Sequence, residues 1–281
     1  RTEALKAAGP AVFIVYVGGL NKDLYQDCEG VDRKSFSLPY GQDELISGLA
    51  AAGRRMVAVM VSGNSYAMPW IDEVPALVQA WYGGSEAGNA IASVLFGDVN
   101  PSGKLPFTFH KRLEDCAAHS IGDYPGDGEN VEYKEGIFVG YRWTDKEGIE
   151  PQFAFGHGLS YTDFSYGEIS LSDRSMSEDD VMTVSIQVTN TGERAGAEVV
   201  QLYVNDVKSS LPRPVKELKG FKKVWLAPGE TAEVTFTIAR DALSYYEPAV
   251  HGWVAEPGDF KVLIGSASDD IRSEARFRLT D

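Results

Sequence analysis

The chain has 281 residues, of which 43% are hydrophobic and 24% charged, values typical of globular proteins and unlike those of collagen-like, mucin-like or disordered chains. At about 150 residues per domain this length indicates two domains, and no apolar run approaches the ~18–20 residues that span a bilayer. A net charge of −15 repels phosphate backbones, so nucleic acid is not an expected partner, whereas neutral substrates remain open.

The first half of the chain alternates short apolar runs with helical patterns. The apolar runs cover residues 11–17, 57–61 and 76–81. Continuous runs of this kind predict parallel strands that are buried on both faces. Residues 42–52 and 86–96 place apolar side chains at helical spacing, and Gly97 follows the second as a helix stop. Strands that alternate with helices predict an α/β sandwich domain with a mostly parallel sheet.

From Phe164 onward the apolar period becomes two. Alternating runs cover residues 184–188, 200–204, 234–238, 260–264 and 275–279. With Pro and Gly turn signals between them, they predict an all-β sandwich of about seven strands, and no helix is signalled there. We therefore expect an α/β domain over residues 1–162, which includes a long, irregular but ordered loop region over 110–162, and an all-β domain over residues 163–281.

The cysteines and histidines give no sign of a cofactor. Cys28 and Cys116 are too few for a disulfide scaffold or a Cys-ligated zinc site, and we expect both to be free thiols. The four histidines lack the spacing of a metal-binding pair, so no metal site is predicted. No glycine-rich phosphate-binding motif follows a predicted strand, and no nucleotide cofactor is expected.

An acidic segment follows the first predicted strand. Residues 27–33 (DCEGVDR) combine the carboxylates of Asp27, Glu29 and Asp32 with the guanidinium of Arg33. A loop beyond the carboxyl end of a parallel strand is where open α/β sheets place their sites. A solvent-exposed acidic loop, in which Asp32 and Arg33 pair, explains the composition of this segment as well as a functional site does.

A second candidate is Ser85, which follows two glycines between a predicted strand and a predicted helix. This arrangement is similar to a degenerate nucleophile elbow of α/β-hydrolases, and His157 would have to serve as its base. The simpler interpretation makes Ser85 a helix N-cap. The five tryptophans could stack on sugar rings, although a single tryptophan is more often part of a core.

Taken in order, several blocks of this sequence resemble family 3 of the glycoside hydrolases. The blocks in the first half are EGVDR at 29–33 with LP at 38–39 and QDELI at 42–46, SG at 62–63 with MPW at 68–70, AWYGG at 80–84 through GDVNPSGKLP at 97–106, GIFVGYRWTD at 136–145 and FAFGHGLSY at 153–161. In the second half, VTNTG at 188–192 and LKGF at 218–221 look like the fibronectin-III-like domain of that family. The resemblance covers nearly the whole chain.

The resemblance implies the C-terminal part of a retaining, exo-acting β-glucosidase that hydrolyses terminal β-D-glucosyl residues of a β-glucoside or oligosaccharide. Within the E-G-x-D-R block, Glu29 matches the general acid/base. An Asp nucleophile would come from a (β/α)8 barrel domain of the same enzyme that is absent from this chain, so the chain alone is expected to be inactive. The family's role in polysaccharide breakdown favours a periplasmic or extracellular place over a cytoplasmic one.

Two alternatives to the glucosidase remain. A β-xylosidase of the same family shares the E-G-x-D-R block, although the Met68-Pro69-Trp70 and Trp81-Tyr82 segments favour the glucosidase. A non-catalytic carbohydrate-binding or assembly module is the other alternative. Apart from Glu29, the resemblance assigns no substrate-binding residue.

Overall fold

The computed structural model describes residues 1–53, 55–122 and 124–280. The chain forms two compact units. The α/β unit comprises residues 1–99 and 109–114, and the β unit comprises residues 100–108 and the chain from Asp115 onward. The predicted fold class, an α/β sandwich with a parallel sheet followed by an all-β sandwich, is confirmed. The domain division after residue 162 stays a prediction.

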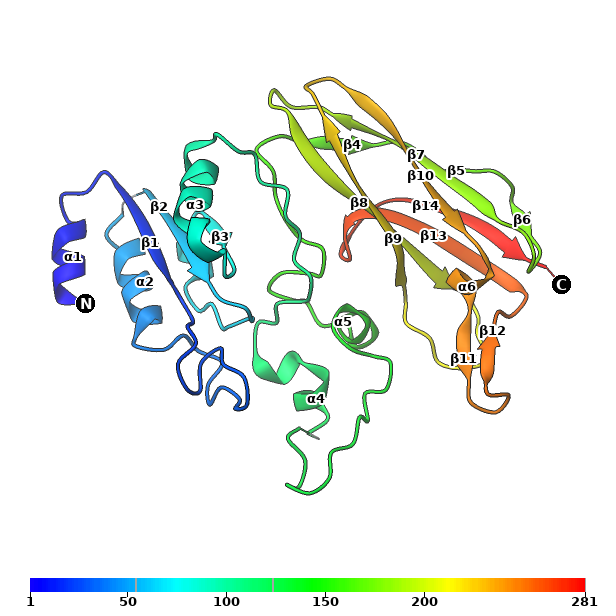
Figure 1. The fold of residues 1–281 in the computed structure, drawn as a ribbon, viewed down its shortest axis with the longest axis horizontal. Helices are drawn as coiled ribbons and strands as arrows, with labels where there is room; N and C mark the ends of the chain where they lie inside the picture. Colours follow the sequence, from blue (N-terminus) through cyan, green and yellow to red (C-terminus); the bar gives the residue numbers. More distant parts are fainter. Residues whose placement is uncertain (54, 123, 281) are drawn as a thin grey trace. The chain divides into compact units, whose positions relative to one another are not determined.

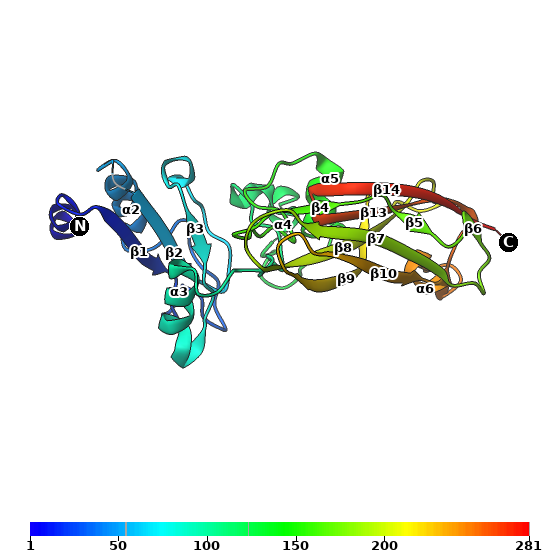
Figure 2. The same cartoon turned by 90° about the horizontal axis from the view of Figure 1, so that it is seen from above.

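The α/β unit is built on a parallel sheet with the strand order β1-β2-β3 (Figure 1). Its elements are α1 (Thr2–Ala8), β1 (Phe13–Gly19), α2 (Gln42–Ala50), β2 (Arg55–Val61), η1 (Ile71–Glu73), β3 (Leu77–Gln79), η2 (Gly84–Glu86) and α3 (Ala87–Phe96). Figure 2 shows α2 and α3 on opposite sides of this sheet. The register pairs Val15 with Val57 and Val59 with Val78.

Burial differs between the strands of this sheet. Central strand β2 is buried from Met56 to Met60, as its continuous apolar run predicts. Edge strand β1 instead alternates, because Ile14 and Tyr16 are buried whereas Phe13, Val15 and Val17 are 53, 50 and 59% exposed. The prediction that β1 is buried on both faces is therefore wrong, since the described residues cover only one of them.

The helices begin and end close to the predicted residues. Helix α3 stops at Gly97, whose φ of 83° lies in the left-handed region that glycine favours. The N-cap assigned to Ser85 is wrong: a 3-10 turn, η2, precedes α3, and Glu86 occupies the N-cap position. Among the described residues, no helix has the length and apolarity that a membrane span requires.

The β unit contains two main sheets, antiparallel except for the parallel pair β6–β14, and a hairpin (Figure 1). One sheet holds β4 (Phe164–Tyr166), β5 (Ser170–Leu171), β7 (Met182–Asn190) and β10 (Thr231–Ile238). The other holds β6 (Ser175–Met176), β8 (Gly196–Asp206), β9 (Glu217–Leu226), β13 (Gly258–Ala267) and β14 (Asp270–Leu279), and the hairpin pairs β11 (Tyr245–Glu247) with β12 (Gly252–Val254). Short helical segments are η3 (Leu113–Asp115), α4 (Ala117–Ser120), α5 (Tyr141–Glu147) and α6 (Arg240–Leu243).

The five alternating runs form β7, β8, β10, β13 and β14, and their inward side chains build one apolar core. Two predictions for this region need correction. The loop region over 110–162 contains α4 and α5, and the all-β half contains helix α6. Strand β9 was not among the alternating runs because Phe221 and Trp225, on one face of it, are both exposed.

A fully buried side chain, Asn190, fastens the end of β7 to its surroundings. Its Nδ2 donates to the carbonyls of Arg194 (2.7 Å) and Leu226 (3.0 Å), and its Oδ1 accepts from Thr162 Oγ1 (2.7 Å) and the Gly192 amide (3.1 Å). The Asn190→Ala variant leaves several of these buried groups unpaired, so we expect the free energy of unfolding to fall by about 2–4 kcal/mol. Urea unfolding monitored by hydrogen exchange in β7 and β8 measures it.

The matched control for this prediction is Gln187→Ala on the same strand. Gln187 is exposed, and its side chain makes no hydrogen bond with a described residue. Its truncation should change the free energy of unfolding by no more than about 0.5 kcal/mol. Equal effects of the two substitutions would contradict a special role for the Asn190 hydrogen bonds.

Candidate functional site

The acidic loop begins at the carboxyl edge of the parallel sheet. It follows Gly19, the last residue of β1, whose amide donates to the side-chain oxygen of Gln42 (2.8 Å). The Gln42 amide nitrogen donates back to the Gly19 carbonyl (2.8 Å). Gln42 is the first residue of α2. Its side chain therefore joins the end of β1, where the loop begins, to the start of α2, where the loop ends.

Asp27 joins this loop to the segments that follow the two neighbouring strands. Its Oδ2 accepts hydrogen bonds from the Gly63 amide (2.5 Å) and the Tyr82 hydroxyl (2.8 Å), and its Oδ1 accepts from Asn64 Nδ2 (2.8 Å). Gly63 and Asn64 follow β2, and Tyr82 follows β3. A Cβ atom at Gly63 would lie 3.0 Å from Asp27 Oδ2 and 3.2 Å from the Tyr82 ring, so only glycine fits without displacing them.

These hydrogen bonds reinforce the charges that the two side chains carry at neutral pH. Partial burial raises the pKa of Asp27, but the hydrogen bonds from Gly63, Asn64 and Tyr82 outweigh it and leave the pKa below its ordinary value. Burial, together with the hydrogen bond to Asp27 and its negative charge, raises the pKa of Tyr82 to about 12. At neutral pH Asp27 is therefore an anionic acceptor and Tyr82 a neutral donor.

Arg33 provides a second anchor on the far side of the loop. Its Nη2 donates to the Ser65 carbonyl (2.5 Å), and its guanidinium lies 5.8 Å from the centre of the Phe36 ring. Arg33 therefore does brace the loop, and the contact that the structure shows is with Ser65 instead of the expected local partner, Asp32. Its Nη1 is buried and has no hydrogen-bond partner among the described residues.

Residues 62–66, which we call the β2 loop, receive both anchors and are themselves held by partly buried hydrogen bonds. Ser62 and Tyr66 are fully buried. Gln79 Nε2 donates to the carbonyl and the hydroxyl of Ser62 (3.0 Å each), and the Tyr66 hydroxyl donates to Gln79 Oε1 (3.0 Å). The Ser62 hydroxyl in turn donates to the Asn64 carbonyl (2.8 Å). The anchors thus attach to a fixed part of the unit.

Glu29 lies between the two anchors and differs from both of them. It is exposed, and its carboxylate makes no hydrogen bond or ion pair with any described residue. The next residue, Gly30, has a φ of 90°, a conformation that residues with a Cβ rarely adopt. The Glu29 carboxylate therefore has no partner among the described residues and lies at a bend of the loop. Hydrogen bonds of Asp27 and Arg33 hold the chain on either side of that bend.

The alternative nucleophile, Ser85, receives no support from its surroundings. It lies in η2, and no described residue hydrogen-bonds with its hydroxyl, whereas an activated serine needs a base within about 2.6–3.2 Å. His157 belongs to the β unit, where its ring stacks on Phe153 with 5.2 Å between centroids. Burial lowers the pKa of His157, and the charges of nearby aspartates oppose that shift.

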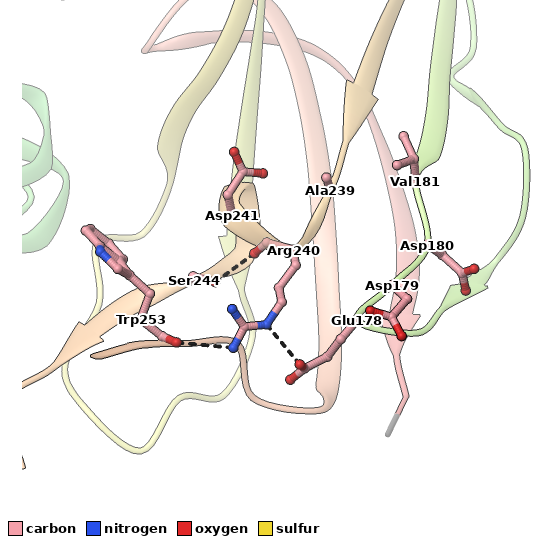
Figure 3. Close-up of a pocket in the computed structure, with 9 residues that line it drawn as sticks. All are labelled: Glu178, Asp179, Asp180, Val181, Ala239, Arg240, Asp241, Ser244 and Trp253. Atoms are coloured by element: carbon pink, nitrogen blue, oxygen red, sulfur yellow. Dashed lines mark hydrogen bonds and ion pairs between the residues drawn. The ribbon is translucent and has the colours of Figure 1, made fainter. Parts of the chain in front are cut away.

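A cavity of about 630 Å³ lies in the β unit beside α6 and the β11–β12 hairpin (Figure 3). Its central side chain, Arg240, donates to Glu178 (2.9 Å) and to the Trp253 carbonyl (3.1 Å). Asp180 accepts from the amide and hydroxyl of Ser177. These charged groups hold the hairpin and the neighbouring turn in place, so we assign the cavity a structural role.

The remaining side chains singled out in the sequence fall into simple classes. Trp70 and Trp143 are buried, and Trp70 donates to Asp43 (2.9 Å), whereas Trp225 and Trp253 are each 64% exposed. Both cysteines are free thiols, as predicted. In the described part of the chain, no group of three or more His, Cys, Asp or Glu side chains is arranged to hold a metal ion.

The sequence alone did not lead to the residues that donate hydrogen bonds to Asp27. Gly63, Asn64 and Tyr82 all follow predicted strands, and the carboxyl ends of parallel strands meet at one edge of a sheet. That rule applied to all three strands together would have placed these side chains beside the acidic loop.

Comparison with known proteins agrees with the family resemblance. The family model described as the glycosyl hydrolase family 3 C-terminal domain matches residues 1–141, and the fibronectin type III-like domain matches residues 198–268. A β-glucosidase of Bacteroides ovatus is 50% identical over 279 residues, which are 99% of this chain and 37% of the relative. A thermostable β-glucosidase B of Acetivibrio thermocellus is 48% identical over 96% of this chain and 35% of the relative.

Solved structures give the same picture. The β-glucosidase of Kluyveromyces marxianus, crystallised with glucose, matches with a TM-score of 0.93 and 40% identity, over 100% of this chain and 33% of that one. A β-glucosidase of Streptomyces venezuelae, also crystallised with glucose, matches with a TM-score of 0.92 and 37% identity, over 99% of this chain and 35% of that one. The chain thus spans about a third of the length of the relatives it matches.

Proposed function

Because the chain belongs to glycosyl hydrolase family 3, we propose that it forms the acid/base part of a retaining, exo-acting β-glucosidase. Its similarity to β-glucosidases extends over nearly its whole length. In this proposal Glu29 is the general acid/base, and an Asp nucleophile comes from a (β/α)8 barrel outside these 281 residues. The substrate is a β-glucoside or oligosaccharide that ends in a β-D-glucosyl residue.

The observation that carries this proposal is the uncommitted carboxylate of Glu29. A general acid/base must release a proton to one oxygen and later take a proton from another, so a permanent ion pair or hydrogen bond would hinder it. Asp27 accepts hydrogen bonds from three donors, which favour its anionic form and lower its pKa, so a proton on Asp27 would cost it these contacts. Among the carboxylates of the acidic loop, Glu29 therefore fits the role better than Asp27.

The proposed chemistry has two steps. In the first, the barrel Asp attacks the anomeric carbon while the C–O bond to the leaving group breaks and Glu29 gives that oxygen its proton. In the second, the Glu29 carboxylate takes a proton from water, whose oxygen attacks the same carbon and releases the Asp. Two inversions give net retention, and the two carboxyl groups must lie about 5–5.5 Å apart.

The chain alone is predicted to have no glucosidase activity, because it would lack the nucleophile. Release of nitrophenol from nitrophenyl β-glucoside by the purified chain measures this. Circular dichroism and a cooperative thermal transition provide the control that the chain is folded. Turnover by the isolated chain, with a rate proportional to its concentration, would contradict the assignment of the nucleophile to a barrel outside it.

The positive test restores a barrel. We call an enzyme that combines this chain with a family 3 barrel the host enzyme; one form replaces the matching region of the Bacteroides ovatus relative with this chain. The host enzyme should hydrolyse nitrophenyl β-glucoside faster than nitrophenyl β-xyloside. The reverse order would favour the β-xylosidase alternative, and a folded host enzyme that hydrolyses neither would favour a non-catalytic module.

A further inference from the structure

We infer that Asp27 is a positioning residue for Glu29, which it aligns through its hydrogen bonds to Gly63, Asn64 and Tyr82. The inference rests on the proposed function, because it concerns how the proposed acid/base is presented. It assigns Asp27 no contact with the sugar and no proton transfer of its own.

The first support is the short tether between the two residues. Glu29 follows Asp27 by two residues, which span at most about 7 Å of extended chain. Asp27 is fixed at both its backbone and its side chain, since its amide donates to the Asn21 carbonyl (2.9 Å) and its carboxylate accepts three hydrogen bonds. A displacement of Asp27 must therefore be transmitted to Glu29.

The second support is that the groups that donate hydrogen bonds to Asp27 are themselves held in place. Two of its donors belong to the β2 loop, which hydrogen bonds from Gln79 to the buried Ser62 hold in place. The third donor, Tyr82, follows Trp81, whose φ of 55° is rare for a residue with a side chain. Strain of this kind persists only where the surroundings enforce it. Here the strained residue directly precedes Tyr82, whose hydroxyl donates to Asp27.

The third support is that side-chain hydrogen bonds hold the loop on both sides of Glu29 but do not involve Glu29 itself. Arg33 holds the far side of the loop at Ser65, and Asp27 holds the near side at Gly63, two residues away on the same β2 loop. Glu29 and Gly30 between them are exposed, and Glu29 has no partner among the described residues. Removing one anchor leaves the bend attached at one side only, so the carboxylate of Glu29 loses its defined place.

The main test is Asp27→Asn in the host enzyme. The amide keeps the volume but offers one acceptor oxygen in place of two, and its NH2 group faces hydrogen-bond donors. Since a displacement of about 1 Å can cost about 100-fold in rate, we expect kcat for cellobiose to fall about 10- to 100-fold. The first step with dinitrophenyl β-glucoside, whose leaving group needs no proton, should fall less than about threefold, and KM should change little.

The double variant separates positioning from a merely structural role. In the Glu29→Ala background, Asp27→Asn should lower the rate by no more than about threefold, because the group that it positions is gone. Azide should not restore the activity of Asp27→Asn, since the Glu29 carboxylate is still present and its negative charge opposes the approach of an anion. Equal losses for both leaving groups, or a full 10- to 100-fold loss on top of Glu29→Ala, would overturn the inference.

Two further variants guard against misfolding. Tyr82→Phe removes one of the three donors and keeps the ring, so it should show the same dependence on leaving group at a smaller size, about 3- to 10-fold. Asp23→Asn is the matched control, because Asp23 lies in the same loop and its hydrogen bonds go to Asn21 and Tyr40. A dependence on leaving group in Asp23→Asn that equals that of Asp27→Asn would overturn the inference.

Failure of the inference and failure of the proposed function give different results. If Glu29→Ala shows no dependence on leaving group, the proposed function fails whatever Asp27 does. If Glu29→Ala behaves as an acid/base variant and Asp27→Asn does not follow it, the inference alone fails. Azide rescue of Asp27→Ala, without rescue of Glu29→Ala, would make Asp27 the acid/base and overturn both.

Discussion

Replacement of Glu29 by alanine in the host enzyme is expected to lower the rate of cellobiose hydrolysis by about 10²–10⁴-fold, the usual contribution of a general acid/base. Cellobiose needs its departing oxygen protonated, so its first step loses most. Dinitrophenyl β-glucoside leaves without a proton, and its first step should be nearly unchanged. Steady-state rates for the two substrates, with pre-steady-state release of dinitrophenol, measure the difference.

The second step provides an independent readout of the same variant. Activation of water still needs a base, so the glucosyl-enzyme intermediate should accumulate and dinitrophenol should appear in a burst. Azide attacks without giving up a proton, and adding it should restore turnover and yield β-glucosyl azide with retained configuration. Nuclear magnetic resonance of the product identifies that configuration.

The control is Glu44→Ala, the same truncation at an exposed carboxylate of helix α2. It should change neither the dependence on leaving group nor the response to azide. Equal rate losses for cellobiose and dinitrophenyl glucoside in Glu29→Ala, with no azide effect, would show that Glu29 only braces the loop. The next acid/base candidates would then be Asp27 and Asp32.

The largest expected effect on stability comes from Arg213 in the β unit. Its side chain is 6% exposed and contacts Asp206 (3.2 Å), Glu217 (2.5 Å) and the Leu243 carbonyl (2.7 Å). The Arg213→Met variant keeps much of the apolar stem but leaves the buried Asp206 carboxylate without its cation, whereas Glu217 keeps only its longer ion pairs with Arg142 (3.4 Å) and Lys219 (3.8 Å). We expect the free energy of unfolding at pH 7 to fall by about 3–5 kcal/mol. Urea unfolding monitored by hydrogen exchange in β8 and β9 measures the loss.

The pH dependence of this loss follows from Asp206. Burial raises the pKa of Asp206, and the charge of Arg213 opposes that rise, so removal of Arg213 should raise the pKa further. A carboxyl whose pKa is higher in the folded than in the unfolded state binds its proton more readily when folded. The folded variant therefore gains stability as the pH falls through that raised pKa. The deficit of Arg213→Met should be smaller at pH 5 than at pH 7.

Arg278→Met is the matched control. Arg278 pairs with Asp259 at 3.2 Å, but the two side chains are 64% and 61% exposed. Pairs of this kind contribute about 0–1 kcal/mol, so this variant should lose little stability at either pH. If Arg213→Met lost no more stability than Arg278→Met, the contacts of Arg213 would have no net stabilising effect.

Features that depend on local pattern were predictable from the sequence. The alternation of Val184, Ile186 and Val188 reflects the pleat of a strand with one buried face, and β7 is found there. The apolar run of β1 was harder to interpret, because such a run looks the same whether one face or both are covered. Whether other elements cover one face of β1 or both depends on the tertiary structure, which the local sequence does not show. Helix α6 has four residues, too few to show a helical period.

The site was predictable only in part, for a related reason. Glu29 was predicted as the acid/base from the family resemblance of the ordered blocks, and this assignment stays a proposal; its exposed, unpaired state needed the structure. The donors to Asp27 lie 36, 37 and 55 residues further along the chain, at Gly63, Asn64 and Tyr82. No local spacing links such distant residues, so the anchoring of the loop became visible only with the three strand ends in place.

The fastening of the Glu29 loop also bears on how an enzyme of this kind can diverge. The side-chain hydrogen bonds described for Asp27 and Arg33 are made with Gly63, Asn64, Ser65 and Tyr82, all within the α/β unit. Substitutions in the β unit therefore remove no donor or acceptor of these hydrogen bonds. Selection can change the surface and charge of that unit, or recombination can exchange it between lineages, while every residue that holds the acidic loop by these hydrogen bonds is retained.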